Sequence, residues 1–254
     1  MSRRYPILKA LAAQALALVG VGVLVVWVCP SVGLRPPLWA AVVLQALLAT
    51  VLGRRFGLAR GWLFFLAGFL PIALGLHLLA LPAWLYLAAF LLVLLLNWNS
   101  FRQGVPLYLT SAPATRRLEE LLRPRPAPVA FIDLGCGLAG PLCHLARAFP
   151  QSQFTGVETA PLTFVLAWLR SLPRRNCRIR YRSLWTTSLA PFDVIYCFLS
   201  PLPMPALWQK AQTELKPGAL LVSNTFAIPG VAPDRTIALG DWRGTCLLVW
   251  EKRP

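Results

Sequence analysis

The stretch FIDLGCGLAG, residues 131–140, decides the fold of the second half of this chain. It joins an apolar run of strand type to a helix-like run that begins near Gly140. Gly135, Gly137 and Gly140 have the spacing G-x-G-x-x-G, and the same letters also spell D-x-G-x-G from Asp133. A glycine loop between a strand and a helix presents backbone N–H groups and the positive end of the helix dipole to an anionic or carboxylate group. The stretch therefore predicts a ligand-binding loop between a strand and a helix.

Runs of strand type and runs of helix length alternate around this loop. The strand-type runs are PVAFIDL (128–134), QFTGVE (153–158), CRIRYRSL (177–184), FDVIYCFL (192–199) and ALLVSNTF (219–226), and the helix-length runs between them are GPLCHLARAF, APLTFVLAWLRSL and MPALWQKAQTELK. Such alternation predicts an α/β fold with a doubly wound, mostly parallel sheet. Residues 235–253 read as two further strands around a turn at 241–244, which indicates a hairpin. We expect a seven-stranded Rossmann-like sheet with an antiparallel last strand over residues 128–254.

Composition shows that the chain has two parts. It has 254 residues, of which 57% are hydrophobic and only 13% charged, and a mean hydropathy of +0.61, which is too apolar for an ordinary soluble domain. All nine acidic residues lie between Glu119 and Glu251, whereas residues 1–118 contain ten Lys or Arg and no acidic residue. The net charge of +16 is therefore largely a signature of membrane-flanking segments.

The first 99 residues are predicted to form an α-helical membrane bundle of about four spans. The expected spans are residues 10–28, 38–53, 61–78 and 82–97. The first, as a helix, is about 28 Å long, which matches the ~30 Å hydrocarbon core of a bilayer. A cleaved signal peptide would have a shorter apolar core followed by a small-residue cleavage site, and residues 28–37, VCPSVGLRPP, offer no such site. We therefore expect a retained multi-pass membrane region.

Basic residues alternate between the predicted loops. They are Arg3, Arg4 and Lys9 before the first span, Arg35 after it, Arg54, Arg55 and Arg60 after the second, none after the third, and Arg102, Arg116 and Arg117 after the fourth. Cytoplasmic loops carry excess Lys and Arg. This pattern predicts cytoplasmic N- and C-termini. The preference for Arg over Lys is typical of a GC-rich bacterial genome, and the membrane is therefore expected to be a bacterial inner membrane. Residues 100–127 are expected to form a linker and a helix before the sheet.

Two carboxylates near the glycine loop bear on the ligand. Asp133 ends the first strand, two residues before Gly135, and Glu158 ends the second strand. A carboxylate at the position of Glu158 accepts hydrogen bonds from ribose hydroxyls in both dinucleotide-binding folds and S-adenosylmethionine-binding folds. Dinucleotide folds usually have an apolar residue at the position of Asp133, whereas a carboxylate there suits the cationic methionyl end of S-adenosylmethionine. Asp133 favours S-adenosylmethionine over a dinucleotide.

Further motifs occur around the loop in a fixed order. They are VPLYLTSAP (105–113), DLGCGLAG (133–140), SLW (183–185), FDVIYCFLSPLPMPAL (192–207) and ELKPGALLVSNTFAIPG (214–230). With these motifs the chain resembles class I S-adenosylmethionine-dependent methyltransferases. Within this class it is similar to a membrane-anchored family that methylates lysine in the ATP synthase c-subunit and in the mitochondrial adenine nucleotide carrier. The resemblance covers about residues 105–230.

The resemblance implies a set of site residues. The cofactor would contact Asp133, Gly135, Cys136, Gly137 and Glu158, with Ser183 and Leu184 near the adenine. Ala139 stands where the family has a third glycine, and Ser183 where it usually has an acid. The loop after the fourth strand contains no acid or histidine, so we expect Ser200, the carbonyls around Pro201 and Tyr108 to orient the acceptor amine.

Three functions remain open from the sequence. The leading hypothesis is N-methylation of a lysine in a membrane protein; the alternatives are methylation of a lipid-soluble small molecule such as a quinone precursor, and a non-catalytic membrane scaffold. A basic cluster comprises Arg170, Arg174, Arg175, Arg178, Arg180 and Arg182. We expect it to form an edge that faces solvent or lipid headgroups rather than nucleic acid. No metal site is expected, because the six cysteines form no C-x-x-C pair and the chain has only two histidines.

Overall fold

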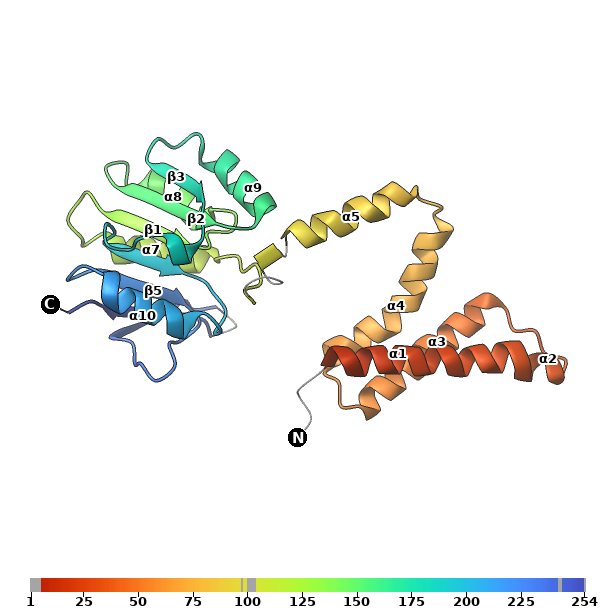
Figure 1. Ribbon diagram of the computed structural model, residues 1–254. Coiled ribbons are helices and arrows are strands. Elements are labelled where there is room, and N and C mark those ends of the chain that lie inside the picture. Colours follow the sequence, from red (N-terminus) through yellow and green to blue (C-terminus); the bar gives the residue numbers. More distant parts are fainter. Residues whose placement is uncertain (1–5, 97, 100–103, 242–243, 254) are drawn as a thin grey trace. The chain divides into compact units, whose positions relative to one another are not determined.

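A computed structural model of the chain describes residues 6–96, 98–99, 104–241 and 244–253. The chain forms two compact units, residues 1–87 and 88–254. The predicted boundary near residue 100 falls after this division, which lies within an apolar helix. Each unit is described by itself below (Figure 1).

The first unit consists of apolar helices. Their bounds are α1 (Pro6–Val23), the π-helical turn η1 (Leu24–Val28), α2 (Cys29–Ser31), α3 (Leu38–Arg55), α4 (Arg60–Leu78) and α5 (Ala83–Leu96), the last of which extends into the second unit. In the described residues, three helical stretches are long and apolar enough to cross a membrane, namely Pro6–Ser31, Leu38–Arg55 and Arg60–Leu78. α5 has 14 residues, fewer than the roughly 20 that a straight span needs. Four apolar helices are therefore present, and three of them have spanning length.

Small residues and a polar contact join α1, α3 and α4. Ala10, Ala13 and Ala17 of α1 are buried, and small side chains let apolar helices approach closely. Gln45 of α3 donates from Nε2 to Oε1 of Gln14 on α1, whose own Nε2 donates to the backbone oxygen of residue 66 on α4 at 3.2 Å. Amide groups thus link the three helices inside an otherwise apolar contact.

The second unit is an α/β domain. Its helices are α7 (Ala112–Leu122), α8 (Gly140–Ala148), α9 (Pro161–Ser171), the 3₁₀ turn η2 (Leu184–Thr186) and α10 (Met204–Glu214); its strands are β1 (Ala130–Leu134), β2 (Gln153–Glu158), β3 (Cys177–Tyr181), β4 (Val194–Cys197), β5 (Leu220–Asn224), β6 (Arg235–Ala238) and β7 (Cys246–Glu251). The strand order is β3-β2-β1-β4-β5-β7-β6. β1 to β5 are parallel, and β7 runs antiparallel to β5 and β6. The predicted seven-stranded sheet with an antiparallel last strand is confirmed.

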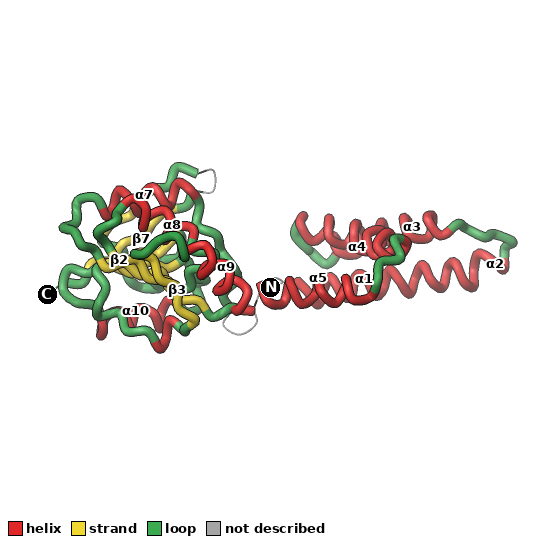
Figure 2. Tube along the Cα trace, turned by 90° about the horizontal axis from the view of Figure 1, so that it is seen from above, coloured by secondary structure: helices red, strands yellow, loops and turns green. Residues whose placement is uncertain are grey.

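The sheet lies between two apolar layers. One core cluster joins α7, α8 and α9 to side chains such as Phe131 and Tyr196, and the other joins α10 to side chains such as Ile132 and Ile195. Figure 2 shows α10 on the opposite side of the sheet from α7 and α8. The strand order reverses between β1 and β4, and in open α/β sheets ligands bind at such a switch point, outside the carboxyl ends of the strands. The topology therefore places the loop at 135–139 at the expected binding edge.

Gly156 allows α8 to pack closely on the sheet. A Cβ atom at this position would lie 2.6 Å from Cδ1 of Leu142 and 2.8 Å from both Sγ of Cys136 and Cδ1 of Ile179. Gly156 is also the partner of Asp133 in the register of β1 and β2. Because Gly156 has no side chain, the start of α8 and the loop before it can lie against the carboxyl end of β1.

Asp193 connects strands at the opposite, amino-terminal edge of the sheet. Its Oδ2 accepts a hydrogen bond from the backbone N–H of Ala130 at 2.7 Å, and its Oδ1 lies 2.6 Å from Nζ of Lys216. Burial opposes ionisation of Asp193, but these two donors outweigh it and hold the pKa of the carboxyl below its ordinary value. Asp193 is therefore a structural carboxylate, far along the strand from the loop at 135–139.

Candidate active site

Left-handed backbone conformations shape the loop that follows β1. Gly135 and Gly137 have φ of +80° and +52°, a region that glycine adopts without steric cost. The N–H groups of Gly135 and Cys136 donate to the backbone oxygen of Val157 at 2.9 and 3.0 Å, which anchors the loop on β2. Ala139 is buried and has φ of +55°, so the chain makes the turn with alanine at a cost of about 1 kcal/mol.

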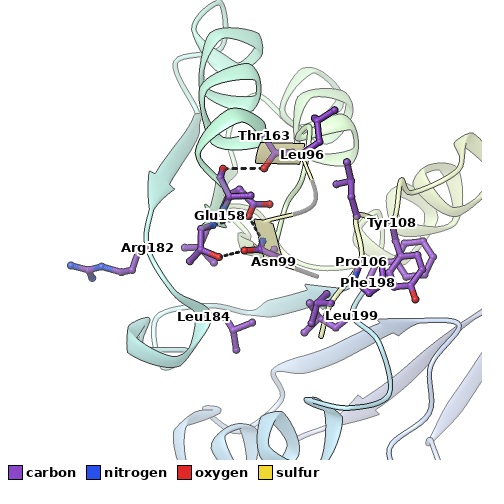
Figure 3. Close-up of a pocket in the computed structure, with 16 residues that line it drawn as sticks. Leu96, Asn99, Pro106, Tyr108, Glu158, Thr163, Arg182, Leu184, Phe198 and Leu199 are labelled. Atoms are coloured by element: carbon purple, nitrogen blue, oxygen red, sulfur yellow. Dashed lines mark hydrogen bonds between the residues drawn. The ribbon is translucent and has the colours of Figure 1, made fainter. Parts of the chain in front are cut away.

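The carboxylate of Glu158 is the hydrogen-bonding centre of the site. It is buried at the end of β2 and accepts the N–H of Gly137 on Oε2 at 2.9 Å. Its Oε1 accepts the N–H groups of Thr159 at 2.6 Å and Ala160 at 2.9 Å, together with Nδ2 of Asn99 at 2.7 Å. Figure 3 shows the Asn99 side chain directed at Glu158 from the segment between α5 and α7. Glu158 thus ties the glycine loop, the start of α9 and Asn99 together.

Asp133 is a second buried carboxylate at this edge. It is the penultimate residue of β1, next to the loop, and is 3% exposed. Burial raises the pKa of this carboxyl well above its ordinary value, and the neighbouring charge of Glu158 raises it further. In the described part of the chain, no group donates a hydrogen bond to the side-chain carboxylate of Asp133. No cationic side chain there pairs with the carboxylate of Asp133 or of Glu158. A cationic ligand bound beside the two carboxylates would offset the repulsion between them and the free-energy cost of burying their charges.

A pocket lies beside these carboxylates. Its lining combines Glu158, Thr159 and Thr163 on one side with an apolar group on the other that comprises Val105, Leu107, Tyr108, Leu184, Phe198 and Leu199. The ring of Tyr108 stacks on Phe198 with centroids 4.9 Å apart and is tilted against Phe226 at 5.5 Å. The pocket therefore has a polar end for hydroxyl groups and an aromatic wall that disfavours charge.

Comparison with known proteins gives the family of this unit. Residues 133–235 match the ANTKMT methyltransferase domain. The chain is 32% identical over 148 residues to adenine nucleotide translocase lysine N-methyltransferase of Mus musculus, an overlap that covers 55% of this chain and 61% of the mouse protein. The chain contains a class I S-adenosylmethionine-dependent methyltransferase domain. The resemblance predicted from the sequence motifs is thereby confirmed, and the chain spans about three fifths of the length of its mouse relative.

Two further similarities each cover part of the chain. Trans-aconitate 2-methyltransferase of Methylobacterium radiotolerans is 38% identical over 84 residues, which is 32% of each protein. The crystal structure of an RNA methyltransferase from Salinibacter ruber, solved in complex with S-adenosyl-L-homocysteine, superposes with a TM-score of 0.52 at 23% identity. This superposition covers 57% of this chain and 94% of that chain. At this level of identity the second likeness shows the fold alone.

The predicted site residues of the methyltransferase domain fall into two groups. Those that line the pocket are Tyr108, Gly135, Glu158 and Leu184. Those that lie outside the pocket lining are Asp133, Cys136, Gly137, Ser183, Ser200 and Pro201. Cys136 packs against β2 beneath the loop, where burial raises the pKa of its thiol well above the ordinary value and keeps it neutral.

Three of the predicted residues have contacts that differ from the expected ones. Ser200 is buried, and its Oγ donates to the backbone oxygen of Gly104 at 2.9 Å instead of lying free in the pocket. Pro201 is exposed. Ser183 caps η2, because its Oγ accepts the N–H of Trp185 at 3.2 Å, and it is Leu184 that lines the pocket.

Most of the lining residues were not predicted as site residues, among them the polar side chains of Asn99, Thr163 and Arg182. Thr163 lies in the first turn of α9, directly after the strand that ends in Glu158, and Arg182 follows the end of β3. Both positions face the carboxyl edge of the sheet, so the strand pattern contained a signal for them. Asn99 is 59 residues from Glu158 in sequence, and no local pattern marks it.

Proposed function

We propose that the chain is a membrane-anchored, S-adenosylmethionine-dependent methyltransferase that methylates the ε-amino group of a lysine in a membrane protein. The observation that carries the proposal is the buried pair Asp133 and Glu158 beside the glycine loop. The name of the mouse relative supports a protein lysine as acceptor. The three apolar helices of spanning length support a membrane anchor.

The site residues fit this cofactor. When bound, S-adenosylmethionine supplies an activated methyl group on a positively charged sulfonium. Asp133 would neutralise the cationic methionyl end, which accounts for a buried carboxylate to which no described residue donates a hydrogen bond. Glu158 would accept the ribose hydroxyls in place of Asn99, the one side chain among the four donors that the described residues supply. Leu184 and Leu199 offer apolar surface for the adenine.

The aromatic wall would act on the acceptor lysine. Removing its proton, from a pKa near 10.4, costs about 4.6 kcal/mol at pH 7. Desolvation against Tyr108, Phe198 and Leu199 lowers that pKa because an apolar surface disfavours the ammonium. Residues 198–203, FLSPLP, contain no acid or histidine, so we propose that this segment orients the amine and supplies no dedicated base. Its carbonyls, with the hydroxyl of Tyr108, would hold the amine in line with the methyl group.

Ser200→Ala and Tyr108→Phe are each expected to lower kcat by about tenfold, the equivalent of one hydrogen bond, with little change in cofactor affinity. Ser200 would act as a positioning residue through Gly104, so its effect should fall on kcat more than on KM. The matched controls Ser188→Ala and Tyr181→Phe remove the same groups from exposed positions and should have no effect. Full activity of both site variants, with cofactor still bound, would remove these residues from the mechanism.

We further propose that the anchor lies in a bacterial inner membrane with both chain ends in the cytoplasm. Support comes from the alternation of basic residues between the helix ends, since Arg54 and Arg55 end α3 and Arg60 begins α4, whereas the turn between α4 and α5 has no Lys or Arg. This orientation would keep the methyltransferase domain on the side where nucleotide-derived cofactors occur.

A lipid-soluble small molecule is the second candidate acceptor, favoured by the aromatic and aliphatic lining of the pocket. We expect membranes from a deletion strain, incubated with the purified protein and tritiated-methyl S-adenosylmethionine, to take up label in the protein phase on partition. Label in the organic phase would instead identify the small-molecule acceptor. Absence of both, together with no calorimetric binding of S-adenosylhomocysteine, would identify a non-catalytic scaffold.

A further inference from the structure

Helix α9 and its C-cap residue expose several large apolar side chains. Val165, Trp168, Leu169 and Leu172 are 44%, 45%, 49% and 57% exposed. Their spacing of i, i+3, i+4 and i+7 forms one continuous stripe along a helix. The side of α9 that packs on the sheet carries the small residues Thr163, Ala167 and Ser171, with Phe164 as the one large side chain there that packs against the described core. This distribution is the reverse of the usual one for a helix that only packs on its own domain.

The strand beside α9 adds positive charge to the same edge. β3 is the outermost strand at this side of the sheet, and α9 lies next to it (Figure 1). The exposed Arg178 and Arg180 of β3 alternate with Cys177 and Ile179, which are buried in the core beneath α9, so the two arginines point to the opposite face of the sheet at this edge. Residues 159–192 contain six arginines and no acidic residue. Among the described residues, none of these arginines forms an ion pair with a carboxylate.

We infer that the outer surface of α9 and β3, here called the α9–β3 face, docks on the surface of an anionic membrane. Aliphatic and tryptophan side chains enter the headgroup region of a bilayer, and arginines bind its lipid phosphates while their stems contact apolar groups. At this edge of the sheet the apolar stripe lies on the face that α9 covers and Arg178 and Arg180 lie on the other, so a bilayer that meets the domain edge-on contacts both. The inference rests on the membrane anchoring proposed above, and it adds a specific contact between the catalytic domain and the lipid.

Other partners fit this face less well. An RNA-binding surface recognises bases by stacking and hydrogen bonding; Trp168 and the arginines can do this, but Val165, Leu169 and Leu172, which make up most of the stripe, offer neither. A second copy of the chain would bring two arginine-rich edges together, and the like charges would repel. An anionic bilayer complements both the charge and the apolar stripe.

Docking of this face would bring the acceptor pocket to the lipid surface. Thr163 in the first turn of α9 and Arg182 after the end of β3 both line the pocket. A domain that rests on α9 and β3 therefore opens its site next to the headgroups. With the domain docked in this way, the pocket can reach acceptor groups at the membrane surface, such as the amine of a juxtamembrane lysine.

The test uses the full chain in nanodiscs, either of neutral phosphatidylcholine alone or with about a third of the lipid as phosphatidylglycerol. Quenching of Trp168 by brominated lipid is obtained as the difference between the wild type and Trp168→Phe. We expect quenching in the anionic discs that weakens at high salt. In Arg178→Gln/Arg180→Gln the ratio of docked to undocked domain should fall about fivefold per arginine, the equivalent of about 1 kcal/mol each. The matched control Arg147→Gln/Arg235→Gln removes two exposed charges from α8 and β6 and should leave quenching unchanged.

Three outcomes would overturn the inference, and a fourth would overturn only the proposed function. Absence of Trp168 quenching in anionic discs, in a protein that binds S-adenosylhomocysteine normally, would reject docking and leave the proposed function intact. Shielding of Trp168 that depends on protein concentration and not on lipid would identify a contact between two copies. Salt-dependent RNA retention that Arg178→Gln/Arg180→Gln abolishes, without lipid quenching, would identify a nucleic-acid surface. Lipid quenching without S-adenosylhomocysteine binding would support docking and reject the enzyme.

Discussion

Asp133→Asn is expected to weaken the binding of S-adenosylmethionine by about 30- to 150-fold, or about 2 to 3 kcal/mol, the loss expected for one partner of a buried charge pair. Asparagine has nearly the shape of aspartate but no charge to neutralise the methionyl end of the ligand. No described residue donates a hydrogen bond to Asp133, so the fold should accommodate the amide. Titration calorimetry of the full chain in detergent measures the change.

The same substitution is expected to raise the melting temperature of the ligand-free protein. Burial and the charge of Glu158 raise the pKa of Asp133 in the folded state above the ordinary value of 3.8. A raised carboxyl pKa stabilises the fold only at low pH, so the free energy of unfolding of the wild type falls as the pH rises from about 3.8 toward the folded-state pKa. The variant lacks this part of the decrease. Wild-type ligand affinity should rise over the same pH range, because a cationic ligand favours the carboxylate.

Asp193→Asn is the matched control at the other edge of the sheet. The pKa of Asp193 is held below its ordinary value, because hydrogen bonds from Lys216 and the N–H of Ala130 outweigh its burial. The stability that Asp193 contributes is present at neutral pH and is lost as the pH falls through the folded-state pKa. Its replacement should therefore lower the melting temperature and leave ligand affinity unchanged. Equal losses of affinity in the two variants would show that Asp133 acts only through the fold.

The parts of the site that could be predicted from sequence are those set by local order along the chain. Asp133 and Glu158 each end a strand, and the parallel pairing of β1 with β2 brings strand ends to one edge. Knowing the strands was therefore enough to place both carboxylates. The antiparallel β7 was predicted for a similar reason, because a short turn leaves two successive strands no other way to pair.

Features that depend on distant parts of the chain could not be predicted in this way. Asn99 reaches Glu158 only through the path of the segment before the domain, which no periodicity in the sequence describes. The run APLTFVLAWLRSL predicted a helix, but α9 has large apolar residues on one side and small ones on the other. Periodicity identifies an apolar stripe without telling which stripe meets the sheet. Small side chains pack there because α9 lies close to β3, and this follows from the tertiary structure.

Glu158→Gln is expected to weaken S-adenosylmethionine binding by about 100-fold, because hydrogen bonds to a charged group are worth about 1.5 to 3 kcal/mol. It should also lower the melting temperature. The wild-type carboxylate accepts three backbone N–H groups, from Gly137, Thr159 and Ala160. An amide has one accepting oxygen, and its NH₂ group would face at least one of these donors. A buried donor left without an acceptor costs about 1 to 3 kcal/mol.

Two further variants separate the parts of this effect. Glu214→Gln changes another carboxylate that accepts a backbone N–H, that of Leu189 at 2.8 Å, and should cost stability without changing affinity. Asn99→Ala removes the one side-chain donor to Glu158, and it should raise affinity slightly because the ligand no longer displaces a hydrogen bond. A loss of affinity in Asn99→Ala as large as in Glu158→Gln would contradict the exchange of Asn99 for ribose. It would instead make Asn99 a permanent part of the cofactor site, through which the segment before the domain controls binding.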